Sequence, residues 1–173
     1  MALALLAVPG TANAESFWQC APFARFFSGI QLFGAAGGWW AQAMGKYAEG
    51  AVPKLGSVLV FKAVGAMRSG HVATVTQVIS ERIIKVTHAN WGGSPGQVEH
   101  DVTVVDASPA NDWSQVKVWY SPIGTVGTHP YPTYGFIYAA KAMAHGAQVA
   151  AADIREDATR ILDRDPPAEA QPR

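Results

Sequence analysis

The sequence predicts a single α+β domain in which short helices come first and β-strands follow. The chain has 173 residues, of which 49% are hydrophobic and 15% are charged. That is enough for one domain with a real core and too little for two large ones. Helix-forming segments lie near the N-terminus, and segments rich in β-branched residues follow from about residue 57.

The overall charge is balanced. The chain carries 13 Lys and Arg residues and 13 Asp and Glu residues. This balance gives no reason to expect nucleic acid or another polyanion as the main partner. We expect binding to depend on a groove.

The first fourteen residues are predicted to be a secretory signal peptide. They carry no charge, run apolar from Ala2 to Val8, and end in the cleavage pattern Ala12–Ala14. The usual basic region is missing, so we expect that the true start lies upstream or that the segment is clipped. The segment is too short for a stable membrane span, which needs roughly 20 apolar residues. The alternative is a frayed apolar terminus or a buried first helix. With a signal peptide, the expected location is the periplasm, the cell wall or the exterior.

Cys20 is the only cysteine of the chain. In an exported protein an unpaired cysteine is an inert buried thiol, an intermolecular link or a reactive group. Lipidation of a new N-terminus is a fourth alternative. We discard it because lipid-modified cysteines follow small residues, whereas Trp18 and Gln19 precede this one.

A short helix is predicted over Gln19–Gly29, with Cys20 at its start. Pro22 falls in the first turn, where a missing N–H does no harm, and Gly29 supplies a C-terminal stop. The free N–H groups and the helix dipole favour thiolate over thiol and so lower the cysteine pKa. The same N–H groups can hold an oxyanion. Small buried cysteines also occur at helix starts, so this placement alone does not establish a nucleophile.

A second helix is predicted over Gly38–Tyr47, followed by a strand over Ser57–Phe61. Adjacent tryptophans point in different directions on a helix. At most one of Trp39 and Trp40 therefore faces the core fully, and the other is available to line a groove.

Residues 70–79 and 83–91 predict a β-hairpin, because both are rich in strand formers. Side chains alternate along a strand. His71 therefore lies on the apolar face of the first strand, and His88 and Asn90 lie on the apolar face of the second.

The expected hairpin register brings these polar residues together. With a two-residue turn at Ser80–Glu81, Asn90 lies opposite His71 and His88 lies on the diagonal. A thiol beside a base that is itself oriented by a third polar group is the arrangement of covalent acyl transfer. A lone strand histidine is more often a satisfied core residue, but the presence of Cys20 favours catalysis. We predict Cys20 as nucleophile, His71 as base, and His88 or Asn90 as the orienting group.

Four motifs follow one another along the chain between about Phe17 and Trp91. They are Gln19–Arg25, the Pro-x-x-Gly-Ser-Val-Leu-Val-Phe run Pro53–Phe61, Gly70–Ala73 and Asn90–Trp91. Their order and rough spacing resemble those of CHAP domains (cysteine, histidine-dependent amidohydrolases/peptidases), which are relatives of the NlpC/P60 enzymes in the papain-like superfamily.

The resemblance implies a papain-like α+β fold, with N-terminal helices packed on an antiparallel β-sheet, and hydrolysis of amides in the peptide part of bacterial peptidoglycan. Cys20 matches the family nucleophile and His71 the family base. Many CHAP domains have Glu-x-Asn where this chain has His88-Ala89-Asn90, whereas a histidine orienter is usual in the NlpC/P60 relatives. Later segments suit the remaining strands of the sheet: Val102–Val105, Val116–Tyr120 and Gly135–Tyr138.

We divide the chain into the signal peptide, residues 1–14, a catalytic domain, residues 15–138, and a tail, residues 139–173. The tail is alanine-rich and then polar, which predicts a helix with a disordered end. It is a candidate for docking a protein partner or for autoinhibition.

The other titratable side chains predict neither a metal nor a cofactor. Three histidines lack metal-ligand spacing and three aspartates lack a calcium-loop pattern: His100, His129, His145, Asp101, Asp106 and Asp112. Aromatic walls of a groove, or turns and core edges, are expected at Asp112–Trp113 and Tyr131–Gly135.

The predicted activity is peptidoglycan hydrolysis by a Cys–His thiol mechanism. The sequence leaves open whether the bond is that of an N-acetylmuramoyl-L-alanine amidase or of an endopeptidase. The alternatives are a catalytically silent wall-binding or regulatory module of the same fold, and a thiol amidase acting on a non-wall peptide or small conjugate.

Overall fold

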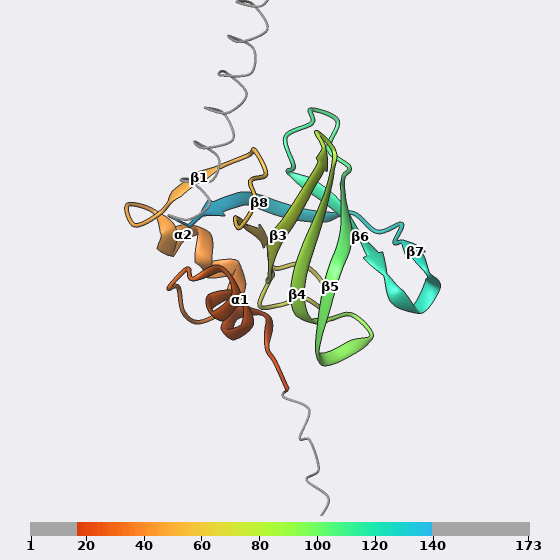
Figure 1. Ribbon diagram of the computed structural model, residues 1–173, viewed down its shortest axis with the longest axis horizontal. Helices are drawn as coiled ribbons and strands as arrows, with labels where there is room; N and C mark the ends of the chain where they lie inside the picture. The colour runs from red at the N-terminus through yellow and green to blue at the C-terminus, as the bar shows by residue number, and fades with distance from the viewer. Residues whose placement is uncertain (1–16, 140–173) are drawn as a thin grey trace, which may run out of the picture.

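The computed structural model describes residues 17–139, shown as the coloured ribbon in Figure 1. The predicted signal peptide and all of the predicted tail after Ala139 lie outside the described residues. The helical elements are α1 (Cys20–Ser28), the 3₁₀ turn η1 (Ala36–Gly38), α2 (Trp39–Ala43) and the 3₁₀ turn η2 (Ser121–Ile123).

The strands form one antiparallel sheet that closes on itself. They are β1 (Ala48–Gly50), β2 (Val58–Phe61), β3 (His71–Ser80), β4 (Ile83–Trp91), β5 (Ser94–Asp106), β6 (Gln115–Tyr120), β7 (Thr125–Val126) and β8 (Tyr131–Tyr138). Consecutive strands pair from β2 to β6, and β8 pairs with both β2 and β6. These six strands make a closed barrel, to which β1 and β7 attach at β8 and β6.

The predicted α+β papain-like fold is therefore wrong. The described domain is mostly β, with about 16% helix, and the barrel replaces the expected layer of helices packed on a sheet. The pairings Gln115↔Pro132 and Val116↔Tyr131 close the barrel. Alternation along a strand shows which side chains share a face, but it does not show whether the two edges of a sheet meet.

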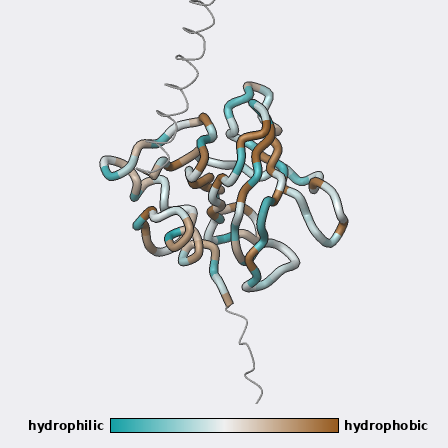
Figure 2. Tube along the Cα trace, viewed as in Figure 1, coloured by the Kyte–Doolittle hydropathy of each residue, from teal (hydrophilic) through white to brown (hydrophobic). Residues whose placement is uncertain are grey.

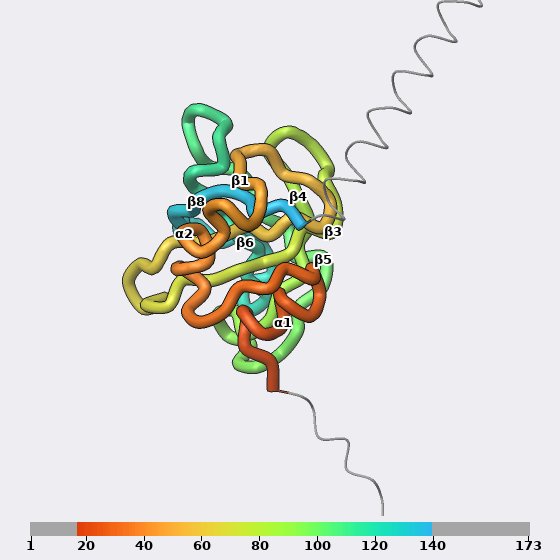
Figure 3. The backbone as a smooth tube through the Cα atoms, turned by 90° about the vertical axis from the view of Figure 1, so that its left-hand side faces the viewer, coloured from red at the N-terminus to blue at the C-terminus, as the bar shows by residue number. Residues whose placement is uncertain are grey.

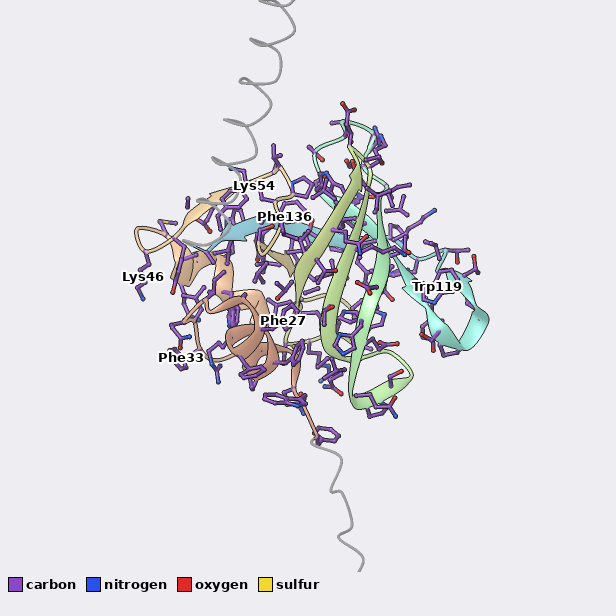
Figure 4. All side chains as sticks on the ribbon, in the orientation of Figure 1. Phe27, Phe33, Lys46, Lys54, Trp119 and Phe136 are labelled. Carbon is purple, nitrogen blue, oxygen red and sulfur yellow. The ribbon has the colours of Figure 1, made fainter. Side chains whose placement is uncertain are left out.

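Two apolar clusters hold the domain together. The first fills the barrel and includes Phe61, Trp113 and Phe136, with edge-to-face contact between the last two rings. Phe136 is labelled on β8 in Figure 4, and the brown segments of Figure 2 gather on the same central strands. The second cluster joins the helical segments to the outer side of β2 and β3 through residues such as Trp39 and Val60. In the turned view of Figure 3, α1 and α2 lie together in front of the strands.

Helix α1 forms where the sequence predicts it. Cys20 is its first residue, and Gly29 ends it in the left-handed region with φ +79°, where its N–H donates to the carbonyl of Arg25. Glycine enters this region without the steric cost of a Cβ. The prediction that Cys20 starts this helix is confirmed.

The predicted hairpin is also confirmed, with a change at its tip. Thr74 pairs with Thr87 and Val75 with Val86, as the expected register requires. Irregularities further along shift the pairing, so that Ser80 pairs with Ile83 and the two turn residues are Glu81 and Arg82. The pairs Thr74–Thr87 and Val75–Val86 keep the predicted register, and the shifts lie between Val75 and the tip. The β3–β4 pairing ends at Thr74 and Thr87, so the expected pair of His71 with Asn90 is not part of the ladder.

The second helix is shorter than predicted. Regular α-helix covers only Trp39–Ala43, after one 3₁₀ turn. Trp39 is fully buried, whereas Trp40 is half-buried and stacks on Tyr134 with ring centroids 5.9 Å apart. One tryptophan thus packs in the core, as expected, and the other covers the outside of β8.

Gly70 places the first residue of β3 and has no room for a side chain. It has φ +67°, and a Cβ there would lie 2.6 Å from the nitrogen of Gly37 and 2.7 Å from the carbonyl oxygen of Phe61. The left-handed conformation costs about 1–2 kcal/mol for a non-glycine residue, and overpacking costs about 1–3 kcal/mol more. We expect Gly70→Ala to lower the free energy of unfolding by about 2–5 kcal/mol, measured by urea denaturation.

Gly65→Ala is the matched control for this prediction. Gly65 also has positive φ, at +52°, but a Cβ there meets nothing within 4 Å. Gly65→Ala should lower the free energy of unfolding only by the cost of the left-handed conformation, about 1–2 kcal/mol. Equal losses in the two variants would show that the contact with Gly37 and Phe61 is not restrictive.

Candidate active site

A cavity of about 760 Å³ runs past the start of α1 and the start of β3. Cys20 and His71 both line it, and so do Asn90 and Trp91 at the end of β4. The loop Val64–Gly70 forms another wall. The closed barrel thus brings together, at one groove, residues that lie far apart in the sequence; the remaining lining residues are Gln19, Gly92, Tyr120, His129 and Tyr131.

Cys20 is a free, half-buried thiol at the N-terminus of α1. Burial raises its pKa, and hydrogen bonds from the backbone of Val72, Ala21 and Cys20 itself only partly offset that rise. The sequence predicted a lowered pKa from the position at a helix start. The structure reverses the direction, because loss of solvent around the charged sulfur outweighs the helix N–H groups.

His71 is a buried histidine whose Nε2 lies 3.0 Å from Nδ1 of His88. Its ring also packs against the rings of Phe61 and Trp91. Burial holds the pKa of His71 well below its ordinary value, and electrostatic repulsion between the two rings when both are protonated lowers it further. His71 is therefore a neutral imidazole at neutral pH, with one ring nitrogen committed to His88.

His88 lies inside the barrel with 1% of its surface exposed. One ring nitrogen meets His71, and the other, Nε2, lies 3.5 Å from Oε2 of Glu99. That separation is long for a hydrogen bond. Both atoms are buried and make no hydrogen bond within the described part of the chain, so this 3.5 Å approach is the one polar contact available to each.

Asn90 makes its hydrogen bonds with residues other than His71. Its Nδ2 donates to Oε1 of Gln19 at 2.8 Å, and its Oδ1 accepts from the backbone N–H of Gly96 at 2.9 Å. Asn90 has φ +60° and falls at an irregularity in the pairing of β4 with β5, which turns its side chain out of the strand alternation. Of the two candidates that the sequence left open, His88 contacts His71, and Asn90 holds the residue before Cys20.

Glu99 is the member of this cluster that the sequence did not single out. It pairs directly with His88 across β4 and β5. Its Oε1 accepts hydrogen bonds from Ser121 at 3.0 Å and from Ser94 at 3.4 Å. Its pKa is lowered chiefly by the hydrogen bond with His88, and the serine hydroxyls add to the effect. The pairing of β5 with β4 is what would have identified Glu99. The predicted strand begins only at Val102, so it does not include this residue.

The other residues considered from the sequence lie in different places. His129 lines the groove beside Tyr131, with the ring centroids 4.8 Å apart. Trp113 is buried in the barrel, and Tyr134 lies outside it against Trp40. His145 lies outside the described residues. Within residues 17–139, no group of three or more His, Cys, Asp and Glu side chains is arranged to hold a metal ion.

Fold and site together define a β-barrel domain in which a cysteine thiol and a histidine line one groove, with a second histidine buried behind the first. The family model of the CHAP domain matches residues 10–90 of the chain. This match confirms the resemblance that the four sequence motifs indicated, and it indicates a peptidoglycan hydrolase or amidase-like function. No curated protein matches the chain significantly. None of the helices in the described residues is long and apolar enough to span a membrane.

The depressed pKa of His71 predicts an acid-dependent loss of stability. Below about pH 6.5 the unfolded chain protonates this histidine while the folded protein does not, so the free energy of unfolding falls as the pH falls. One group contributes at most about 1.4 kcal/mol per pH unit. We expect His71→Gln to flatten the dependence between pH 7 and pH 5, measured by urea denaturation.

His129→Gln is the control, because it removes an exposed histidine. Glu99 acts in a separate window: its pKa is lowered, so its contribution is present above its ordinary pKa of about 4.5 and is lost only at lower pH. An unchanged slope in His71→Gln between pH 7 and pH 5 would mean that His71 can protonate within the fold.

Proposed function

We propose that the protein is a thiol amidohydrolase that cleaves an amide bond in the peptide part of peptidoglycan. The observation that supports this best is the contact between His71 and His88 at the groove that Cys20 also lines. A nucleophile and a base at one cavity, with a third group behind the base to orient it, is the arrangement that acyl transfer requires. The family match points to the same chemistry and to the same polymer.

The resting site holds a neutral thiol and a neutral imidazole. Burial raises the pKa of Cys20, and burial together with His88 lowers the pKa of His71. Both directions disfavour the ion pair, so His71 acts as a general base during attack rather than holding the thiol proton beforehand.

The reaction then proceeds in two halves. Cys20 Sγ attacks the amide carbonyl while its proton passes to Nδ1 of His71, the ring nitrogen not bonded to His88. N–H groups at the start of α1 stabilise the oxyanion. The C–N bond breaks, the departing amine takes the proton from His71, and a thioester remains on Cys20. His71 next removes a proton from water, whose oxygen attacks the thioester to release the acid and restore the thiol.

The groove offers both aromatic surface and a positive charge to a peptide. Its lining includes the aromatic side chains of Trp91, Tyr120 and Tyr131 and the guanidinium of Arg68. Cleavage next to the muramoyl group and cleavage within the peptide use the same chemistry and differ in what the two ends of the groove accept. We propose the periplasm or cell wall as the place of action, on the basis of residues 1–14.

Cys20→Ala removes the nucleophile and should abolish turnover without unfolding the domain. The measurement is release of soluble muropeptides from purified sacculi, with mass spectrometry to identify the bond that is cut. Glu81→Gln, in the turn between β3 and β4, is the control and should keep full activity. Digestion by Cys20→Ala at the wild-type rate would contradict the proposal, and a wild-type protein without activity would favour a silent wall-binding module.

Alkylation of Cys20 tests whether the resting pair is neutral. Because burial raises the thiol pKa, the rate of reaction with iodoacetamide should reach its half-maximum above the ordinary cysteine pKa of about 8.5. The single cysteine makes the readout specific, since mass spectrometry of the labelled protein counts one site. A half-maximum several pH units lower would show a thiolate–imidazolium pair instead.

A further inference from the structure

The two carboxylate oxygens of Glu99 have different partners. The carboxylate has no donor of its own when ionised. Oε1 accepts from the hydroxyls of Ser94 and Ser121, and Oε2 faces Nε2 of His88. The 3.5 Å contact between Oε2 and Nε2 is attractive only when Nε2 carries a proton, because a bare Nε2 would set its lone pair against the carboxylate.

This proton on His88 determines the state of the next ring. A neutral imidazole carries one N–H, so Nδ1 of His88 is a lone pair and accepts from Nε2 of His71 across 3.0 Å. Nε2 of His71 then carries the proton, and Nδ1 of His71 is left unprotonated. Each ring therefore donates from Nε2 and leaves Nδ1 unprotonated, and the same orientation repeats from the carboxylate to the groove.

We propose that Glu99 is a positioning residue that fixes the tautomers of both His88 and His71, so that an unprotonated Nδ1 of His71 faces the groove that Cys20 lines. Its use in catalysis rests on the proposed function; the tautomers themselves do not. Ser94 and Ser121 take part by holding Oε1, which leaves only Oε2 for His88.

Glu99 also lies where small molecules can reach it. A second pocket, of about 370 Å³, is lined by Glu99 together with Lys85, His100, Trp119 and Ser121. Neither Cys20 nor His71 lines this pocket. The carboxylate therefore connects the histidine pair to a space separate from the groove, and a truncated side chain there can be replaced from solution.

Glu99→Gln is expected to reverse the direction of hydrogen-bond donation along residue 99, His88 and His71. The hydroxyls of Ser94 and Ser121 donate to the amide oxygen, so the amide N–H₂ group faces Nε2 of His88 and donates to it. His88 must then carry its proton on Nδ1. His71 must then accept at Nε2 and carry its own proton on Nδ1, where it cannot take one from the thiol. We expect kcat to fall about 100-fold or more with little change in KM, because one general-base step is lost.

The ring-nitrogen NMR spectrum of isotopically labelled histidines measures the tautomers without any substrate. Wild type should show His71 with Nε2 protonated and Nδ1 bare, and Glu99→Gln should show the reverse. Glu81→Gln is the matched control and should leave both rings as in wild type. A wild-type spectrum for Glu99→Gln would overturn the proposal even if the protein hydrolyses peptidoglycan as expected.

Glu99→Ala provides a second test, through chemical rescue. Acetate contains the carboxylate and the carbon that this change removes, and it can enter through the second pocket. We expect acetate to restore a measurable part of kcat in Glu99→Ala, to have no effect on Glu99→Gln, where the amide fills the space, and none on Cys20→Ala.

The outcomes separate the two proposals. Reversed tautomers in Glu99→Gln with no activity in any variant, wild type included, would support the role of Glu99 and contradict the proposed function. Wild-type kcat in both Glu99→Ala and Glu99→Gln, with the fold intact, would overturn the role of Glu99 and leave the amidase assignment standing.

Discussion

The site depends on one contact, the 3.0 Å approach of Nε2 of His71 to Nδ1 of His88 inside the barrel. Two buried imidazoles can share a hydrogen bond only if one donates and the other accepts, and two adjacent positive charges would be strongly disfavoured. The pair therefore needs a fixed acceptor at its far end. Glu99 provides that acceptor, because it pairs with His88 across β4 and β5.

Barrel closure makes this arrangement stable. Because β8 joins β6 to β2, His88 faces an interior filled by aromatic and branched side chains, and Trp91 stacks on its ring. Both imidazoles are almost completely buried, which strengthens their hydrogen bond and lowers the pKa of His71. An open sheet would leave one face of the pair to the solvent, where the rings could exchange tautomers freely.

Local patterns predict the parts of this site that lie within one element. The start of α1 at Cys20 and the shared face of His71 and His88 follow from turn residues and from strand alternation. The pairing of β6 with β8 joins distant segments, and no local pattern encodes it. Glu99 was missed for the same reason, since its partner is defined by strand register. The left-handed φ of Asn90 reverses a side chain that alternation places beside His71.

The reactivity of Cys20 shows two local effects in competition. Its position at a helix start favours the thiolate, whereas its burial favours the thiol, and burial prevails. A thiol that stays protonated at rest requires a base that stays neutral, which is the state that burial and His88 impose on His71. The raised pKa of Cys20 and the lowered pKa of His71 therefore have the same cause. Burial keeps the thiol protonated at rest and keeps the imidazole neutral, so that it can accept the thiol proton.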